Sequence, residues 1–168
     1  TSQYCNCNTE LLVMKEALGL VAGKVAAVVV ALGEFAETWK HLPVLGYTHY
    51  QPAQPTTVGK RATVWAQDFV LMLEELEFRL DRLRFRGIKG TTGTQASFLS
   101  LFDGDEEKVD ELDCMITEKM GWSVERRFTV TGQTYPRVLD AQVLSTIAGI
   151  GAVSHRLATD LRLLANRR

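Results

Sequence analysis

Cysteine, proline and aromatic residues are all scarce in this chain of 168 residues, which has three cysteines, four prolines and 8% aromatic side chains. Three cysteines cannot all pair, and Cys5 and Cys7 are separated by a single residue, which makes a mutual disulfide difficult. The same two residues lack the second pair of ligands that a structural zinc site needs. We therefore expect reduced thiols, as in a cytoplasmic protein.

An excess of charge of one sign is also missing, since the formal net charge is -1. A balance this close to zero gives no general attraction to nucleic acid or to an anionic membrane. The content of 46% hydrophobic and 23% charged residues is that of an ordinary globular protein and not of a disordered one. The sequence thus predicts one domain with its own core, and neither nucleic acid nor a membrane as a partner.

One apolar run, LGLVAGKVAAVVVALG at residues 18–33, is shorter than a membrane-spanning helix requires and carries Lys24 near its middle. We interpret it as a buried helix of a soluble protein. Because it is apolar nearly all round, it should be covered on several sides, which is more cover than this chain can provide. Partner chains are expected to provide the rest.

Helical periodicity dominates the remainder of the chain. The pattern predicts helices from about residue 9 to 39, from 57 to 86, from 106 to 120, and from residue 136 onward. Asp105 is suited to cap the third helix and Gly121 to end it. Strand-like alternation is missing apart from a short extended piece at RFTVTG, residues 127–132. We therefore predict an all-α fold, a bundle of long helices completed by oligomerisation.

Both ends of the chain have the character of internal sequence. The chain begins without methionine, and the helical pattern of its last segment continues to Ala165 without a stop signal. We expect residues 1–168 to be the central helical domain of a larger protein, truncated at both ends.

Polar segments interrupt the helices, and the first of them is the opening TSQYCNCNTE. Asn8 or Thr9 is suited to cap the first helix, as such residues commonly do. The functional alternative is that Thr1 and Ser2 hold an anionic group at a helix N-terminus. From the residue pattern alone, capping is favoured.

The second polar segment, GYTHYQPAQPTTVG at residues 46–59, carries His49. A histidine titrates near neutral pH, so it can donate a proton to a leaving group or accept one. Thr48 and the neighbouring glutamines could fix its tautomer or hold substrate. The alternative is a solvent-facing histidine in a loop that only turns the chain. The other histidines, His41 and His155, have no metal-ligand spacing with it.

Two further segments contain glycine and amide side chains. RFRGIKGTTGTQASF, residues 84–98, could wrap an anion with its backbone N–H groups beside Lys89, although it is not a phosphate-binding P-loop because the final Gly-Lys-Ser/Thr is missing. TGQTYPR, residues 131–137, places Gln133 just before a helix. Each segment alone is a weak signal, because glycine-rich turns and glutamines at helix entrances are common.

Taken in order, these segments carry a resemblance. TSQY, GYTHYQPAQPTTVGKR, RFRGIKGTTGTQASFL, TGQTYPR and TDLRLLAN resemble adenylosuccinate lyases in both sequence and approximate spacing. THYQPAQPTT is similar to the wider fumarase/aspartase superfamily, whereas the segment at residues 84–98 looks specific to the adenylosuccinate lyase family. The resemblance covers essentially the whole chain.

The resemblance implies a homotetramer whose long helices form a central bundle and whose active sites are each shared among three subunits. It implies β-elimination of fumarate from adenylosuccinate, giving AMP, and from the succinylated aminoimidazole carboxamide ribotide of purine synthesis. It implies no metal and no organic cofactor.

The same resemblance assigns residues. His49 matches the family's catalytic histidine, the general acid that protonates the leaving nitrogen. The substrate-binding residues that it implies, the last two on weaker grounds, are Thr1, Ser2, Gln133, Thr48 and Gln95.

The chain departs from the family pattern in three respects. Cys7 stands where the family usually has an aspartate before Asn8. The family's catalytic base is a serine in a flexible SSxMPxKxNP-type loop, which has no counterpart here, and the N-terminal region that supplies phosphate-binding residues is also missing. We therefore expect residues 1–168 alone to be inactive. Two alternatives stay open, a fragment of another fumarate-releasing enzyme such as argininosuccinate lyase, and a non-catalytic helical oligomerisation module.

Overall fold

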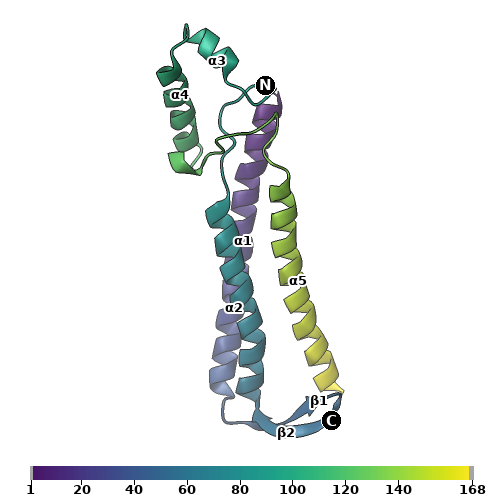
Figure 1. The fold of residues 1–168 in the computed structure, drawn as a ribbon. Helices are drawn as coiled ribbons and strands as arrows, with labels where there is room; N and C mark the ends of the chain where they lie inside the picture. Colours follow the sequence, from purple (N-terminus) through teal and green to yellow (C-terminus); the bar gives the residue numbers. More distant parts are fainter. Residues whose placement is uncertain (1, 167–168) are drawn as a thin grey trace. The chain divides into compact units, whose positions relative to one another are not determined.

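The structure is a computed structural model that describes residues 2–166 (Figure 1). The elements in chain order are α1 (Ser2–Thr38), β1 (Pro43–Thr48), β2 (Gln51–Thr57), α2 (Val58–Arg82), α3 (Ala96–Leu101), α4 (Glu106–Lys119), the short 3-10 helix η1 (Val124–Arg126) and α5 (Val138–Ala165). The predicted all-α class with long helices is confirmed. Contacts divide the chain into two compact units, one comprising residues up to 19 with 79–143, the other residues 20–78 with those from 144 onward.

The second unit is held by packing among α1, α2 and α5. Its core contains Ala36, Ala62 and Trp65, and partly buried leucines from α1 and α5 pack against them. Gly59 permits a close approach at the start of α2, because a Cβ there would lie 2.4 Å from the Ala36 carbonyl oxygen. Gly149 of α5 likewise leaves room for the Met72 side chain of α2, because a Cβ on Gly149 would stand 2.7 Å from the Met72 sulfur.

Polar contacts join α2 to α5 within this unit. The Trp65 indole Nε1 donates a hydrogen bond of 2.8 Å to Asp160 Oδ2, and Arg156 forms an ion pair with Asp68. A buried indole N–H requires an acceptor, and the Asp160 carboxylate provides it. This contact therefore fixes the last turns of α5 against the first turns of α2.

The buried apolar residues of the first unit come from the start of α1, the segment after α2, α4 and the residues that follow it, and the start of α5. The rings of Phe85 and Trp122 lie 5.2 Å apart between centroids, and both residues are buried. Phe85 also forms an isolated parallel bridge with Arg127. The extended piece predicted at residues 127–132 is therefore reduced to this single bridge.

The start of α1 differs from the prediction. The helix begins at Ser2, so neither Asn8 nor Thr9 caps it. Asn8 is instead buried within the helix, 4% exposed, and its Nδ2 donates to the Gly87 carbonyl oxygen at 3.4 Å. A side chain that looks suited to a local cap is thus used for a contact with a residue far along the chain.

A β-hairpin and a short helix are among the elements that were not predicted. Residues 43–57 form an antiparallel hairpin of β1 and β2 with an irregularity between Leu45 and Tyr47. The short helix α3 follows the glycine-rich segment, with Gln95 at its N-cap position. The predicted start of the last helix at residue 136 was also two residues early, since α5 begins at Val138.

Helix α4 begins at Glu106 as predicted and ends at Lys119, one residue before the predicted end. Asp105 Oδ1 accepts a hydrogen bond of 3.1 Å from the Lys108 backbone N–H, and Gly121 follows the helix end with a φ of 79°. The hydrogen bond from the Lys108 N–H, followed by the contact with the Lys108 side chain, lowers the pKa of Asp105 below its ordinary value of 3.8.

This cap makes a testable contribution to acid stability. A carboxylate whose pKa is lowered by folding stabilises the native state above its unfolded pKa and loses that contribution as the pH falls through the folded value. Asp105→Asn keeps a capping side chain but does not titrate. We expect wild-type protein to be more stable than Asp105→Asn at neutral pH, and the difference in urea midpoint to shrink below about pH 3.8. A difference that stays constant on acidification would contradict this account.

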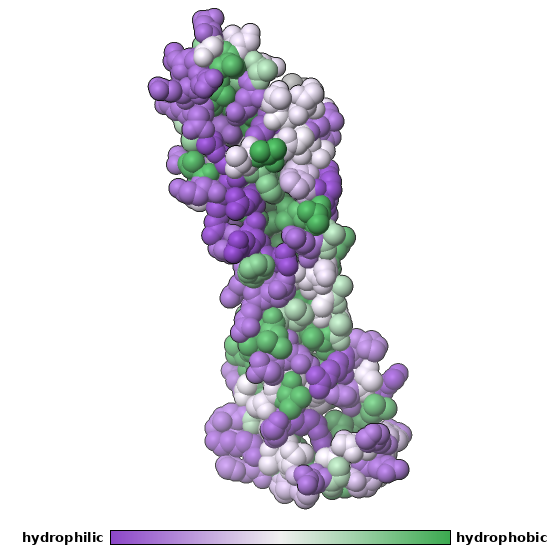
Figure 2. Space-filling model, in the orientation of Figure 1, coloured by the Kyte–Doolittle hydropathy of each residue, from purple (hydrophilic) through white to green (hydrophobic). Residues whose placement is uncertain are grey.

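Helix α1 is exposed to an unusual degree for its composition. Helix α1 is long and apolar enough to span a membrane by length and composition alone, and only 11% of its most apolar stretch is buried within the described chain. Leu20 is 71% exposed and Val30 is 59% exposed. The face drawn in Figure 2 likewise shows apolar side chains among polar ones along the long helices. The chain itself covers little of this helix.

Candidate functional site

His49 lies at the tip of the β1–β2 hairpin. Thr48 pairs with Gln51, so His49 and Tyr50 form a two-residue turn. Both have left-handed backbone, with φ of 54° at His49 and 59° at Tyr50, as a type I′ turn requires. Glycine and asparagine are the usual residues at such positions, because a Cβ makes this conformation unfavourable. The hairpin therefore displays an exposed histidine at the expense of backbone strain.

The hairpin is anchored at both ends within the second unit. The Val58 N–H donates to the Leu42 carbonyl oxygen at 3.0 Å, which closes its base. At the turn, Asn166 Nδ2 donates to the Tyr50 hydroxyl at 2.9 Å, which connects it to the end of α5. Arg61 donates to the Leu45 carbonyl oxygen at 2.9 Å from the first turn of α2. These contacts hold the His49 backbone in place although its side chain is exposed.

A cavity of about 380 Å³ lies beside the hairpin in the same unit. Its lining includes two tyrosines of the hairpin, two cationic side chains of α2, and the Trp65–Asp160 pair. Of the two turn residues, Tyr50 contributes to this lining. The polar residues of the lining are Tyr47, Tyr50, Thr56, Lys60, Arg61 and Asp160, together with the Trp65 indole.

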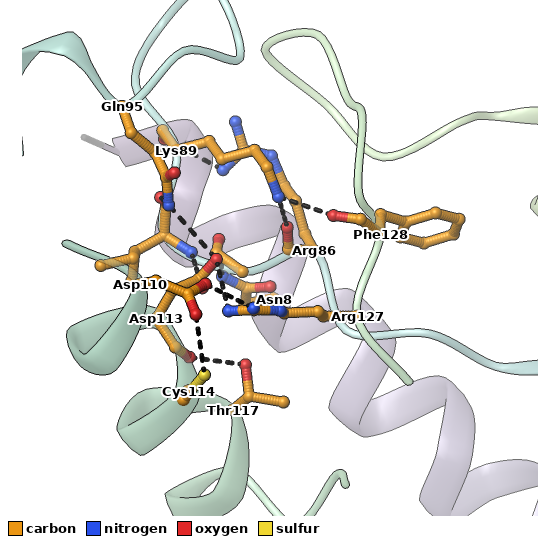
Figure 3. Close-up of polar contacts among 12 residues, drawn as sticks. Asn8, Arg86, Lys89, Gln95, Asp110, Asp113, Cys114, Thr117, Arg127 and Phe128 are labelled. Carbon is orange, nitrogen blue, oxygen red and sulfur yellow. Dashed lines mark hydrogen bonds and ion pairs between the residues drawn. The ribbon is translucent and has the colours of Figure 1, made fainter. Parts of the chain in front are cut away.

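The first unit contains a buried cluster of polar side chains (Figure 3). At its centre is Asp113 of α4, which is 4% exposed. Asp113 Oδ1 accepts from the Ile88 N–H at 2.9 Å, and Oδ2 accepts from Gln95 Nε2 at 3.2 Å. Arg127 approaches the same carboxylate at 3.3 Å. One carboxylate thereby holds both ends of the glycine-rich segment 88–95 against α4.

Gly87 makes this arrangement possible. Its φ is 79°, and a Cβ there would stand 2.7 Å from Asp113 Oδ1. Any other residue would therefore push the carboxylate away from the Ile88 N–H. The glycine-rich composition of this segment serves close backbone packing here.

Lys89 is the second charged residue of the cluster, and it is 8% exposed. Its Nζ donates to the carbonyl oxygens of Arg86 at 3.0 Å and Phe128 at 2.7 Å. Burial lowers the pKa of Lys89 below its ordinary value, and Asp113 opposes that shift. The ammonium group is occupied by these carbonyl oxygens, so Lys89 acts in packing the segment and not as a surface cation.

Comparison with known proteins places this arrangement in a family. A protein-family model described as "Lyase" matches residues 6–167. The chain belongs to the lyase family. It is 46% identical over 166 residues to the adenylosuccinate lyases of Schizosaccharomyces pombe and of Saccharomyces cerevisiae, which is 99% of this chain and 34% of each of those proteins. The predicted resemblance to adenylosuccinate lyase is confirmed.

Other relatives agree with this assignment. The lyase chain is 45% identical over 167 residues to the adenylosuccinate lyase of Schistosoma mansoni, covering 99% of this chain and 34% of that protein. A crystal structure of fumarate lyase from Mesorhizobium sp. BNC1 matches with a TM-score of 0.83 at 23% identity, over 98% of this chain and 36% of that chain, which supports the fold. The chain spans about a third of the length of the relatives that it matches.

The predicted site residues of this lyase fall into two groups. Ser2, Gln95 and Gln133 belong to the first unit, whereas Thr48 and His49 are neighbours in the second. Ser2 is the exposed first residue of α1, and Gln133 is exposed in the segment before α5. Thr1 lies outside the described residues.

Gln95 is the predicted residue whose side-chain amide is already engaged. Its Nε2 donates to the Ile88 carbonyl oxygen at 3.1 Å as well as to Asp113.

Among residues 2–166, no three His, Cys, Asp or Glu side chains are grouped as ligands for a metal ion.

Arg86 and Asp113 are the residues of the cluster that sequence reasoning missed. Arg86 lay at the polar end of a predicted helix, and Asp113 looked like any acidic residue of an amphipathic helix. A signal did exist for Arg86, which stands between Phe85 and Gly87 in a segment with three glycines. A charged residue in an apolar, glycine-containing segment indicates a buried charge with backbone partners.

Proposed function

We propose that the protein is a carbon–nitrogen lyase that cleaves adenylosuccinate to AMP and fumarate. The same β-elimination would release fumarate from the succinylated aminoimidazole carboxamide ribotide, which makes it an enzyme of purine biosynthesis in the cytoplasm. The observation that carries this proposal is the 46% identity to adenylosuccinate lyases over 99% of the chain. The motif RFRGIKGTTGTQASF, which looks specific to that family, favours it over argininosuccinate lyase.

The proposed chemistry assigns His49 as the general acid. A base removes a proton from the carbon beside a carboxylate of the succinyl group, and the electron pair forms the double bond of fumarate as the carbon–nitrogen bond breaks. The departing nitrogen takes a proton from His49. Donors aimed at the charge that develops on the carboxylate lower the barrier. The exposed position of His49 at a hairpin tip supports access to a substrate.

The remaining proposed site residues bind the substrate. Thr1 and Ser2 would hold the carboxylates of the fumarate half, with Gln133, Thr48 and Gln95 as further neighbours. No segment of residues 1–168 resembles the family's serine loop. We infer that the base comes from outside these residues and that they form the central part of the enzyme.

We also propose a homotetramer with shared active sites. The support is the exposure of large apolar side chains on all three long helices, including Leu20 at 71%, Leu71 at 53% and Leu144 at 67%. Exposed apolar surface of this extent is typical of helices that pack against other subunits.

Fumarate release by the complete protein tests the proposed activity. We expect turnover of adenylosuccinate and none of argininosuccinate, followed as fumarate absorbance. Turnover of argininosuccinate alone would assign the other fumarate-releasing activity. Turnover of neither substrate by folded protein would leave the helical oligomerisation module as the better description.

A further inference from the structure

Arg86 is the most completely buried charged residue of the first unit, at 1% exposed. Its guanidinium donates three hydrogen bonds to backbone carbonyl oxygens, from Nη1 to Lys89 at 3.1 Å, and from Nη2 to Gly90 at 3.2 Å and Gly132 at 3.1 Å. Two of these acceptors belong to the glycine-rich segment, and the third is the residue before Gln133. One side chain thus joins two segments that are separated by some forty residues of sequence.

The burial of Arg86 is unfavourable in itself. Desolvation lowers its pKa, against the opposing influence of Cys7, Tyr4 and Asp113. Its Nε has no hydrogen-bond partner among residues 2–166. A buried guanidinium generally stabilises a fold less than apolar packing of the same volume would. A role in fixing the geometry of its three acceptors accounts for its presence better than a role in stability does.

The planar guanidinium is suited to that role. Its N–H groups point in fixed directions, so three acceptors are held in one arrangement relative to each other. The two segments also meet nearby, because a Cβ on Gly93 would stand 1.9 Å from the Thr131 carbonyl oxygen. Lys89 adds a parallel contact through the Phe128 carbonyl oxygen. Displacement of either segment would therefore carry the other with it.

We propose that Arg86 is a positioning residue that sets the place of Gln133 through its hydrogen bond to Gly132. The inference rests on the proposed function, in which Gln133 contacts the substrate. Gln133 itself is exposed, so its side chain is accessible to a ligand. The backbone before Gln133 is held by the hydrogen bond that the Gly132 carbonyl oxygen accepts from Arg86. Arg86 would thus influence substrate binding without touching the substrate.

A double-mutant cycle in the complete protein tests this proposal. Arg86→Lys keeps the positive charge but loses the planar fork, and Gln133→Ala removes the amide. We expect each single variant to raise the KM for adenylosuccinate by about tenfold, as the loss of one hydrogen bond would. Because both act on the same contact, the double variant should differ from Gln133→Ala by no more than about twofold. Arg84→Lys, an exposed arginine two residues away, is the matched control and should leave KM unchanged.

A purely structural role predicts a different pattern. Arg86→Lys would then lower the amount of active enzyme, and so the apparent kcat, with KM unchanged, and its effect would add to that of Gln133→Ala. Either result would overturn the proposal. If Arg86→Lys does not accumulate as folded protein, Arg86→Gln, which can still donate to one carbonyl oxygen, takes its place in the same cycle.

Amide hydrogen exchange separates this proposal from the proposed function. Residues 129–134 should exchange faster in Arg86→Lys than in wild type, while α2 is unchanged, whether or not the protein turns over adenylosuccinate. Faster exchange with no turnover in wild type would leave the positioning contact intact and reject the assigned substrate. Unchanged exchange would reject the positioning role itself.

Discussion

Replacement of His49 by glutamine is expected to reduce kcat/KM for adenylosuccinate by about a thousandfold, which is the usual scale for loss of a general acid or base. The glutamine side chain is polar and similar in size but cannot donate a proton to the leaving nitrogen. Since His49 is exposed at a hairpin tip and packs against little, the fold should be unaffected. Steady-state fumarate release, with circular dichroism as the check on folding, measures both quantities.

The pH dependence of the rate provides a second test of the acid role of His49 with the same variant. If His49 supplies the proton, the decline of the wild-type rate at high pH reports loss of that proton, and this decline should vanish in His49→Gln. His41→Gln is the matched control, because His41 is also exposed and precedes the same hairpin. A rate for His49→Gln within about tenfold of wild type, or an unchanged pH profile, would remove His49 from the acid role.

Replacement of Asp113 by alanine is expected to lower the free energy of unfolding by about 3 kcal/mol, the scale for removing one partner from a buried charged network. The substitution leaves the Ile88 N–H and Gln95 Nε2 without this acceptor, and Arg127 without a buried partner. Urea unfolding followed by circular dichroism measures the change.

Asp110 is the matched control for this prediction. It lies on the same helix and also pairs with Arg127, but its side chain is 67% exposed. An exposed ion pair contributes at most about 1 kcal/mol, so Asp110→Ala should be close to wild type. Equal effects of the two substitutions would mean that the ion pair with Arg127, and not the clamp on the glycine-rich segment, accounts for the contribution of Asp113.

The helices could be predicted from sequence because their signals are local. The apolar spacing along α2 and α5, and the cap and glycine around α4, are decided within a few residues of each position. The predicted start of α1, at about residue 9, was wrong for a reason that is not local. An asparagine such as Asn8 favours a helix cap when only its neighbours are considered. In the structure its side-chain amide instead donates a hydrogen bond to the Gly87 carbonyl oxygen, 79 positions away.

The hairpin was missed because its sequence lacks the usual signals. Its turn is His-Tyr where Asn-Gly would be expected, and β2 contains two prolines and no apolar alternation. What stabilises it is contact with other elements, including the bond from Arg61 to Leu45. Such contacts are visible only once α2 and α5 are in place.

The candidate site divides in the same way. Motif resemblance supplied the residues expected to meet the substrate, including His49 and Gln133. It did not supply Arg86 and Asp113, whose roles depend on burial and on partners that are distant in sequence. Sequence patterns thus identify the groups that face outward more readily than the buried ones that hold them.

The left-handed turn at His49 and Tyr50 lowers the stability of the hairpin but carries the proposed proton donor. A search for more stable variants of this protein would favour Asn-Gly at these two positions, because those residues adopt the same backbone with less strain. That replacement would also delete the proposed proton donor. Thermostability engineering should therefore leave positions 49 and 50 untouched and seek its gains in parts of the chain where the backbone is relaxed.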